Sequence, residues 1–318
     1  MAKKSKDNRR IKLVKSVYQQ GGRLNLADKI YKKRFVDFFA KRVADDAANG
    51  DATSSFVLEK GKTAKAQIKT TEDGFICGLA ELELFYKHFG LVFTFVSQDD
   101  KTVKSGETLC TVEGDAITLL TLERTALNIV RCMSGIATIT KKFVDILKDF
   151  PTIIAATRKT RFEEFLEKSA VARAGGLTHR LGLSEHILIK DCHLDVLKSF
   201  GEEDTIGGVI QRAMKSKLPV EIEVCSFDEA FLAAKAFKKI DKKNPKIIML
   251  DNMTPAEVGY TIGFLKNKNM YEDIIFEASG GITLDNLSDF AKAGVDVIST
   301  SQITESALVL DIHQKILI

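Results

Sequence analysis

The sequence contains few cysteines, and none of them forms a Cys-x-x-Cys pair. The five are scattered and odd in number: Cys77, Cys110, Cys132, Cys192 and Cys225. Such spacing indicates neither a disulfide framework nor a zinc site of the usual kind. It favours a reducing compartment, so we expect a cytoplasmic protein.

Long apolar runs and a large net charge are also missing. No run approaches the roughly 20 apolar residues that cross a bilayer, so we expect no membrane association. The net charge of +4 in 318 residues indicates no nucleic acid or other polyanionic partner. Five basic residues cluster within residues 3–10, without an apolar segment behind them that could serve as a signal peptide. The sequence therefore predicts a basic flexible tail over residues 1–22.

The composition that remains, 45% hydrophobic and 28% charged, is typical of a soluble globular protein with one large domain or two smaller ones. Apolar residues three to five apart predict an amphipathic helix over 27–48. Short apolar runs between residues 56 and 112, beginning with Phe56-Val57-Leu58, predict a mainly antiparallel sheet with a helix over 79–88. We interpret residues 23–133 as a sandwich-like α+β domain.

After residue 138 the pattern alternates between strands and helices. Strands are predicted near 152–156, 187–190, 219–224, 246–251, 274–278 and 295–299, with helices between most of them. Repeated β-α units indicate a parallel sheet, which periodicity alone leaves either open or closed into a barrel. Charged or hydroxyl side chains follow nearly every strand, which favours a barrel over residues 134–303. Residues 304–318 are predicted to pack back on the N-terminal domain.

Cations are concentrated between the first two of these strands. The basic residues of the stretch from Ile153 to His193 include these seven: Arg158, Lys159, Arg161, Arg173, His179, Arg180 and Lys190. This density indicates a pocket for a small molecule with several negative charges. Arg158 and Arg180 could each grip a carboxylate or phosphate bidentately, while Lys159 and Lys190 serve as point charges. Any one of them could instead be an ordinary solvated charge.

Acids and glycines follow the later strands. Glu223 and Asp251 end two successive strands, where their oxygens suit Mg²⁺ or ribose hydroxyls. Either acid could also balance a lysine of the same pocket, and the two interpretations are compatible. Ser279-Gly280-Gly281 ends the next strand, where backbone N–H groups could approach a phosphate together with the loop around Ser301. A plain turn is the alternative.

Three histidines, His179, His186 and His193, recur every seven residues. Turn and strand signals lie between them, so they cannot share one helical face. We therefore expect no metal cluster from this repeat.

Several segments in this order resemble the signatures of the quinolinate phosphoribosyltransferase family, also called nicotinate-nucleotide pyrophosphorylase (carboxylating). The matching segments are Glu123-Arg124 with Asn128, Met133 to Thr138, Thr157 to Thr160, Ala174 to Arg180, Gly182 to Ser184 and Leu188 to His193. Linked motifs in the right order are more specific than one short pattern.

The resemblance implies a fold and a reaction. The fold is an incomplete, seven-stranded α/β barrel of the TIM type behind the α+β domain. The reaction transfers the phosphoribosyl group of 5-phosphoribosyl 1-pyrophosphate to quinolinate, with Mg²⁺ as cofactor. The products are nicotinate mononucleotide, pyrophosphate and CO₂, a step of NAD biosynthesis.

The resemblance also implies roles for individual residues. Quinolinate is expected to contact Arg124, Arg158, Lys159, His179, Arg180 and Lys190. The phosphoribosyl donor is expected to contact Glu223, Asp251, Ser279, Gly280, Gly281 and Ser301. Of these, Lys159, Lys190, Glu223 and Asp251 are the expected catalytic residues, and the two acids would hold Mg²⁺ directly or through water. Arg124 is expected to reach a neighbouring subunit, which implies a homodimer or a higher oligomer.

Two other functions fit part of the sequence. A related molybdenum-transport-associated protein shares the Ala-Gly-Gly-Leu-x-His-Arg segment, although Ile189-Lys190-Asp191 and Met249 to Asn252 favour the quinolinate enzyme. A non-catalytic protein that binds phosphate esters is the third candidate, because a fold does not dictate a function. That protein would bind its ligand without releasing pyrophosphate.

Overall fold

The computed structural model describes residues 2–201, 205–240 and 243–317. Its contacts divide the chain into two units, each built from three stretches of sequence. The barrel unit comprises residues 1–20, 142–159 and 176–302, and the sheet unit comprises 21–141, 160–175 and 303–318. The two units are thus interleaved along the sequence, whereas the prediction assigns residues 23–133 to the α+β domain and 134–303 to the barrel as continuous stretches, with 304–318 returning to the α+β domain.

The barrel unit contains a sheet of six parallel strands in the order β6-β11-β10-β9-β8-β7. These strands are β6 (Ile153–Ala155), β7 (Ile187–Ile189), β8 (Val220–Val224), β9 (Lys246–Asp251), β10 (Ile274–Ser279) and β11 (Val297–Ser299). The first strand of the series, β6, pairs with the last, β11, as in a barrel. The predicted α/β class and the six predicted strand positions are confirmed.

The seventh predicted strand is reduced to one isolated parallel bridge, between Ala155 of β6 and Leu177. The next residue leaves the sheet, because the N–H of Thr178 donates to the carbonyl of Tyr18 rather than to a neighbouring strand. Within the described residues the sheet therefore has six strands, and the count of seven is wrong.

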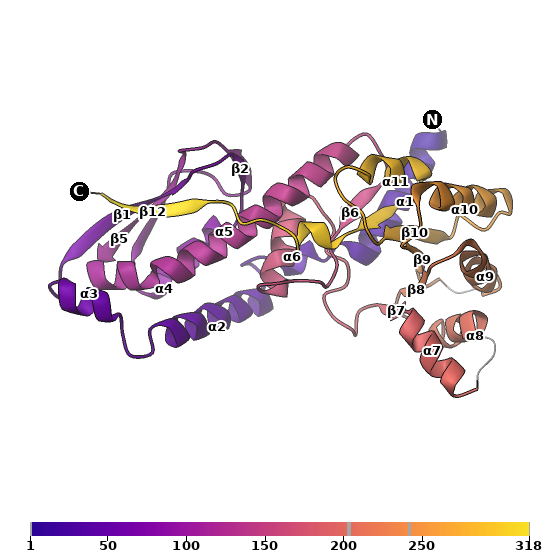
Figure 1. Cartoon of the computed structure of the whole chain (residues 1–318), viewed down its shortest axis with the longest axis horizontal. Coiled ribbons are helices and arrows are strands. Elements are labelled where there is room, and N and C mark those ends of the chain that lie inside the picture. Colours follow the sequence, from indigo (N-terminus) through magenta and orange to yellow (C-terminus); the bar gives the residue numbers. More distant parts are fainter. Residues whose placement is uncertain (1, 202–204, 241–242, 318) are drawn as a thin grey trace. The chain divides into compact units, whose positions relative to one another are not determined.

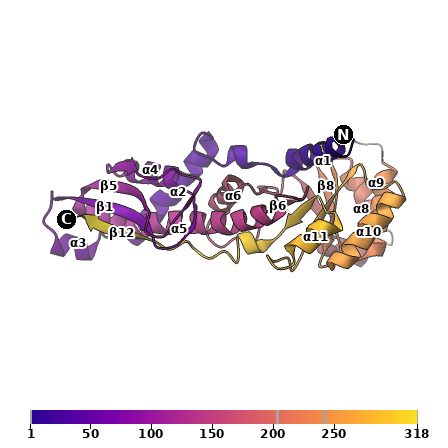
Figure 2. The ribbon, with the colours of Figure 1, turned by 90° about the horizontal axis from the view of Figure 1, so that it is seen from above.

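Helices lie on the outer side of these strands (Figure 1 and Figure 2). They are α7 (Asp191–Ser199), α8 (Thr205–Ala213), α9 (Phe227–Lys238), α10 (Pro255–Asn267) and α11 (Leu287–Ala293). Local signals set their starts: the hydroxyl of Ser226 caps α9, and Thr254 with Glu257 forms a capping box on α10. Strands β8, β9 and β10 are buried along nearly their whole length, which explains their continuous apolar sequence.

The N-terminal region differs from the predicted flexible tail. Residues from Ala2 to Tyr18 form helix α1. Val14, Val17 and Tyr18 are buried in a cluster with residues of the parallel strands. The guanidinium of Arg10 donates to the carboxylate of Asp296, with Nε at 2.7 Å from Oδ1. Apolar residues at i, i+3 and i+4 made this end a core-packing helix, and the basic residues before them obscured that signal. Residue 1 lies outside the described residues.

The sheet unit contains an antiparallel sheet in the order β12-β1-β5-β3 and a hairpin-like pair, β2-β4. Its strands are β1 (Thr63–Thr70), β2 (Gly74–Ile76), β3 (Val92–Phe95), β4 (Lys101–Val103), β5 (Thr108–Asp115) and β12 (Ile312–Leu317). Its α-helices are α2 (Lys29–Asp46), α3 (Ala52–Val57), α4 (Leu79–His88), α6 (Glu164–Arg173) and α5 (Ala116–Leu147), of which α5 belongs to this unit up to residue 141. Its 3₁₀ turns are η1 (Gly21–Arg23) and η2 (Ser301–Ile303), and η2 begins in the barrel unit. The mainly antiparallel α+β class is confirmed.

One predicted strand of this unit, Phe56-Val57-Leu58, is wrong. The carboxylate of Asp51 accepts the N–H of Ser54 and starts helix α3, which contains Phe56 and Val57. Phe56 is 92% exposed, so the apolar run does not mark a buried strand. A local cap overrode the β propensity of these residues.

In the part of the chain that the structure describes, no helix combines the length and the apolar character needed to cross a membrane.

Candidate active site

A cavity of about 240 Å³ lies at the carboxyl ends of β9, β10 and β11. Its lining includes six of the predicted site residues: Lys159, Asp251, Ser279, Gly280, Gly281 and Ser301. Ser299 and Thr300, from the predicted loop around Ser301, also line it. The sequence did not single out the four remaining polar residues of the lining: Thr157, Asn252, Thr283 and Gln302. Each of the four is next to, or within two residues of, a predicted one, so the strand-end rule would have found them if it had been applied more widely.

The shape of the loop after β10 depends on Gly280. Its φ is +88°, and a Cβ at this position would lie 2.3 Å from Oδ1 of Asn252. The N–H of Asn252 donates to the carbonyl of Ser279 at 2.9 Å, which ties the end of β9 to this loop. Gly281 also has a positive φ, +63°, but no atom lies near its Cβ position. The loop is therefore closed on the side of Asn252 and open over Gly281.

The helix that follows this loop does not begin directly after it. Helix α11 starts at Leu287. Before it, the carboxamide of Asn286 accepts the N–H of Thr283 and donates to the carbonyl of Gly281. Any phosphate in the cavity would thus meet the N–H groups of the loop and the hydroxyls of its neighbours rather than a helix end.

Glu223 and Lys190 form the acid–base pair of the site. Nζ of Lys190 lies 3.2 Å from Oε2 of Glu223, and both side chains are partly exposed. Burial raises the pKa of Glu223, the positive charge of Lys190 opposes this shift, and the negative charge of Asp251 adds to it. Glu223 and Asp251 therefore repel each other, and a divalent cation between them would relieve that repulsion. These two carboxylates fit the predicted Mg²⁺ on the grounds of charge and ligand type.

Arg180 begins a loop that connects to β7. Its Nη1 donates to the carbonyl of His186 at 3.0 Å, and the N–H of Leu181 donates to Oε2 of Glu185 at 2.8 Å. The loop is thus closed on itself. We call residues 179–186 the arginine loop.

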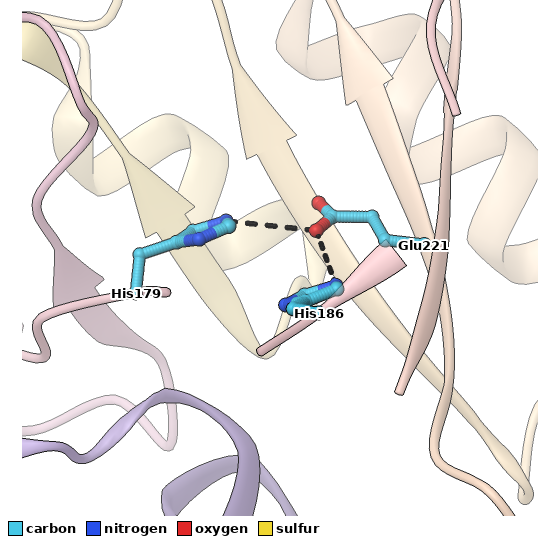
Figure 3. Close-up of side chains that lie close together, drawn as sticks. All are labelled: His179, His186 and Glu221. Atoms are coloured by element: carbon cyan, nitrogen blue, oxygen red, sulfur yellow. Dashed lines mark ion pairs between the residues drawn. The ribbon is translucent and has the colours of Figure 1, made fainter. Parts of the chain in front are cut away.

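The two ends of the arginine loop meet beneath it in a buried cluster (Figure 3). Oε2 of Glu221 lies 2.8 Å from Nε2 of His186 and 3.6 Å from Nε2 of His179. The two imidazole rings are parallel, with centroids 5.4 Å apart. Oε2 of Glu277 lies 3.6 Å from Nε2 of His179, and the ring of Tyr18 packs edge-on against His179. We call these five residues the histidine–glutamate cluster; all are at most 5% exposed.

This cluster brings together two of the three repeated histidines, which sequence analysis left apart. His179, His186 and Glu221 present ligand atoms within 4.8 Å of one another, as a metal site requires. However, Nδ1 of His179 accepts the N–H of Arg180 at 2.8 Å, and Nε2 faces the two carboxylates. Burial lowers the pKa of His179, but the charges of Glu277 and Glu221 outweigh burial and raise it to about 9. Because Nδ1 accepts an N–H group, the neutral ring carries its proton on Nε2, which faces the carboxylates and offers no lone pair to a metal.

The role predicted for His179 is direct contact with the substrate, and it stays a prediction. Its imidazole lies in the histidine–glutamate cluster, and it is not among the residues that line the cavity. The third histidine, His193, lies elsewhere, where its Nδ1 accepts the N–H of Lys190 at the start of α7.

Two of the seven cations belong to the sheet unit and serve its structure. Arg173 pairs with Glu81, Asp99 and Asp100, and Arg161 donates to the carbonyl of Ala307. Arg158 and Lys159 are exposed at the end of β6. Arg124 is exposed on α5 in the sheet unit, so it is not held in the protein interior.

Comparison with known proteins decides the family. The model of the quinolinate phosphoribosyl transferase N-terminal domain matches residues 51–134, and that of the C-terminal domain matches residues 136–315. The chain belongs to the quinolinate phosphoribosyl transferase family. A family member from Mycobacterium leprae, named nicotinate-nucleotide pyrophosphorylase [carboxylating], is 33% identical over 87% of this chain and 95% of its own. The protein of Methanothermobacter thermautotrophicus with the same name, marked "Probable", is 34% identical over 88% of this chain and 98% of its own.

Solved structures of the family share the fold. The nicotinate-nucleotide pyrophosphorylase of Ehrlichia chaffeensis has a TM-score of 0.79 and 28% identity, covering 89% of this chain and 98% of its own. The family's α+β and barrel architecture is thus the architecture of this chain, and its members are pentosyltransferases.

Proposed function

We propose that this protein transfers the phosphoribosyl group of 5-phosphoribosyl 1-pyrophosphate to quinolinate and releases pyrophosphate and CO₂, leaving nicotinate mononucleotide. Family membership supports this reaction. The observation that carries it in the structure is the cavity at the strand ends, where Lys159, Asp251 and the Ser279 to Gly281 loop line one space. A cation, an acid and a phosphate-sized loop are the groups that a phosphorylated sugar requires.

Quinolinate carries two carboxylates, and we assign them to cations of the barrel unit. Arg158 and Arg180 suit bidentate contacts with carboxylates, and Lys159 and Lys190 add point charges. His179 supports Arg180 from below, through the arginine loop. Arg124 completes the group from a second copy of the chain, which makes a symmetric dimer the minimal active unit.

The phosphoribosyl donor occupies the later strand ends in this proposal. Glu223 and Asp251 hold the ribose hydroxyls and Mg²⁺, which when bound neutralises charge on the pyrophosphate. Lys159 contacts the pyrophosphate or quinolinate. The Ser279 to Gly281 loop and Ser301 take the 5-phosphate through N–H and hydroxyl groups.

These residues act by position and charge. They hold the ring nitrogen of quinolinate against the anomeric carbon, so that a reaction between two molecules becomes effectively intramolecular. Cations near the departing pyrophosphate and acids near the electron-poor ribosyl carbon stabilise the transition state. The N–C bond forms as the C–O bond to pyrophosphate breaks. The positive ring nitrogen then stabilises the electron pair left on the adjacent ring carbon when CO₂ departs, a proton from water binds to that carbon, and no nucleophilic side chain is needed.

The direct test is pyrophosphate release by the purified protein with 5-phosphoribosyl 1-pyrophosphate and Mg²⁺. Quinolinate is expected to support release with stoichiometric CO₂, and nicotinate, which lacks the second carboxylate, is expected to support none. Release with neither acid would contradict the proposal and favour the molybdenum-transport paralogue or a phosphate-ester-binding protein.

Arg158→Ala and Arg180→Ala should each lower kcat/KM for quinolinate on the order of 100-fold or more. A bidentate pair of charge-assisted hydrogen bonds contributes roughly 3 kcal/mol, and each 1.36 kcal/mol is tenfold in rate. Lys198→Ala is the matched control, because Lys198 pairs with Asp195 on the exposed side of α7 and should leave the rate unchanged. Near-normal kcat/KM in a folded Arg158 or Arg180 variant would refute the assignment of that residue.

A further inference from the structure

The histidine–glutamate cluster lies below the proposed site, and its two acids are used by none of the steps above. Its two acids occupy related positions on neighbouring strands: Glu221 lies two residues before Glu223 on β8, and Glu277 lies two residues before Ser279 on β10. Because side chains alternate along a strand, residues two apart point to the same face. Each buried acid is therefore one layer, about 7 Å, below a residue proposed to bind the phosphoribosyl donor.

Burying two carboxylates is costly unless hydrogen bonds satisfy them. Within the described residues, neither Glu221 nor Glu277 has an oxygen with a well-aligned hydrogen bond, and both side chains are 0% exposed. Their polar neighbours are the two imidazoles and the hydroxyl-bearing ring of Tyr18. Such an arrangement persists only where the surrounding structure enforces it, which points to a role in function.

The residues that Glu221 joins indicate that role. His179 and His186 are the first and last residues of the arginine loop, and both Nε2 atoms lie against the same oxygen of Glu221 (Figure 3). Arg180 is hydrogen-bonded to both of these histidines: its backbone N–H donates to Nδ1 of His179, and its guanidinium donates to the carbonyl of His186. The orientation of the guanidinium thus depends on two anchors that share one carboxylate.

We propose that Glu221 is a positioning residue for quinolinate: it clamps both ends of the arginine loop and so fixes Arg180. The inference deepens the proposed function and rests on it. Glu221 touches no substrate and acts through His179 and His186. Glu277 assists at the His179 end only.

Glu221→Gln tests this proposal, because it keeps the shape of the side chain but removes the charge that faces both rings. We expect KM for quinolinate to rise about tenfold, with KM for 5-phosphoribosyl 1-pyrophosphate changed less than twofold. Amide hydrogen exchange of residues 180–186 should accelerate, because the N–H groups of Arg180 and Leu181 are held within this loop. Glu221→Asp keeps the charge and should restore part of both effects.

Two further variants make the result decisive. Asp289→Asn removes an exposed carboxylate paired with Lys292 and should change neither KM nor exchange. His186→Asn releases only one end of the loop and should raise KM for quinolinate in the same direction; it decides the matter if Glu221→Gln does not fold. Unchanged exchange with unchanged KM for quinolinate, or an equal rise in both KM values, would overturn the proposal.

Amide hydrogen exchange of the arginine loop is measured without substrate. It therefore tests the Glu221 clamp separately from the proposed phosphoribosyl transfer. If the wild-type protein does not turn over quinolinate, the proposed function fails. In that case, accelerated exchange in Glu221→Gln still supports the clamp, and unchanged exchange refutes it.

Discussion

In each unit of this protein a basic side chain faces two or more carboxylates, and the two arrangements differ. In the sheet unit, Arg173 gives Nη1 to Glu81 at 2.9 Å, Nη2 to Asp99 and Nε to Asp100 at 2.7 Å. In the barrel unit, His179 offers one Nε2 to two carboxylates, each at 3.6 Å. A guanidinium has enough donors for three acids, whereas an imidazole leaves two acids sharing one donor. The first arrangement is typical of structural support, and the second of a site whose stability is reduced for function.

The largest expected effect in this comparison comes from removing the guanidinium. Arg173→Ala should lower the free energy of unfolding by about 3 to 5 kcal/mol, because it leaves the buried Glu81 and two nearby acids without their cation. Urea unfolding followed by circular dichroism measures it. Lys87→Ala, which breaks the exposed pair with Glu83, should cost less than about 1 kcal/mol. A loss no larger than this control would show that the arginine cluster is not a structural support.

A matched pair of isosteric variants sharpens the comparison further. Glu81→Gln should cost about 2 to 3 kcal/mol, since its oxygens accept from Arg173 and from the hydroxyl of Tyr31, both at 2.9 Å. Glu277→Gln should cost about 1 kcal/mol or less, because its oxygens accept no aligned hydrogen bond and its charge repels Glu221. The same urea titrations decide it. If the two costs are equal, the proposed contrast between the clusters is wrong.

A smaller effect than the loss of Arg173 or of the Glu81 charge is expected from the pH dependence of the histidine–glutamate cluster. The pKa of His179 is raised from 6.5 to about 9 in the folded protein. The stabilisation from its charge is therefore complete below pH 6.5 and is lost as the pH rises through 9. Uptake of the second proton must displace the N–H of Arg180 from Nδ1, so we expect a loss of only about 1 to 2 kcal/mol.

This dependence is measured as the stability difference between the wild type and the Glu221→Gln, Glu277→Gln double variant. His186 and Tyr18 also face the cluster, and both remain in each protein. The difference should shrink between pH 6.5 and 9.5. The corresponding difference for Arg173→Ala should stay constant, because a guanidinium keeps its charge over this range. A constant difference in both cases would show that His179 does not titrate with the two carboxylates.

Much of the fold could be predicted from local pattern. Strands β8, β9 and β10 are continuous apolar runs because helices cover one face and the barrel interior the other, and a pattern of that kind is legible in sequence. The site residues that end these strands could be predicted because each follows such an apolar run. Asp251 and Ser279 follow buried runs, and both line the cavity.

What could not be predicted depends on long-range register. The pairing of Ile187 with Val220 places His186 just before the start of β7, where its side chain reaches Glu221 of β8, and no local signal contains that pairing. The turn and strand signals between the histidines correctly excluded a shared helical face. They could not show that two of the histidines meet across a sheet. Arg173 was grouped with the pocket cations for a similar reason, since its three acids are about 70 to 90 residues away in sequence.

The antiparallel sheet has a consequence for how the chain acquires its structure. Strand β1 lies between β5 and β12, and its register joins Lys65 to Leu317 and Thr70 to Ile312. During translation β1 and β5 are synthesised long before β12. Until β12 is synthesised, one edge of β1 has unpaired N–H and C=O groups that can bind any other strand. Such an edge is a template for association between chains. Nascent or C-terminally shortened chains should therefore aggregate through β1, although the cavity residues lie in the other unit.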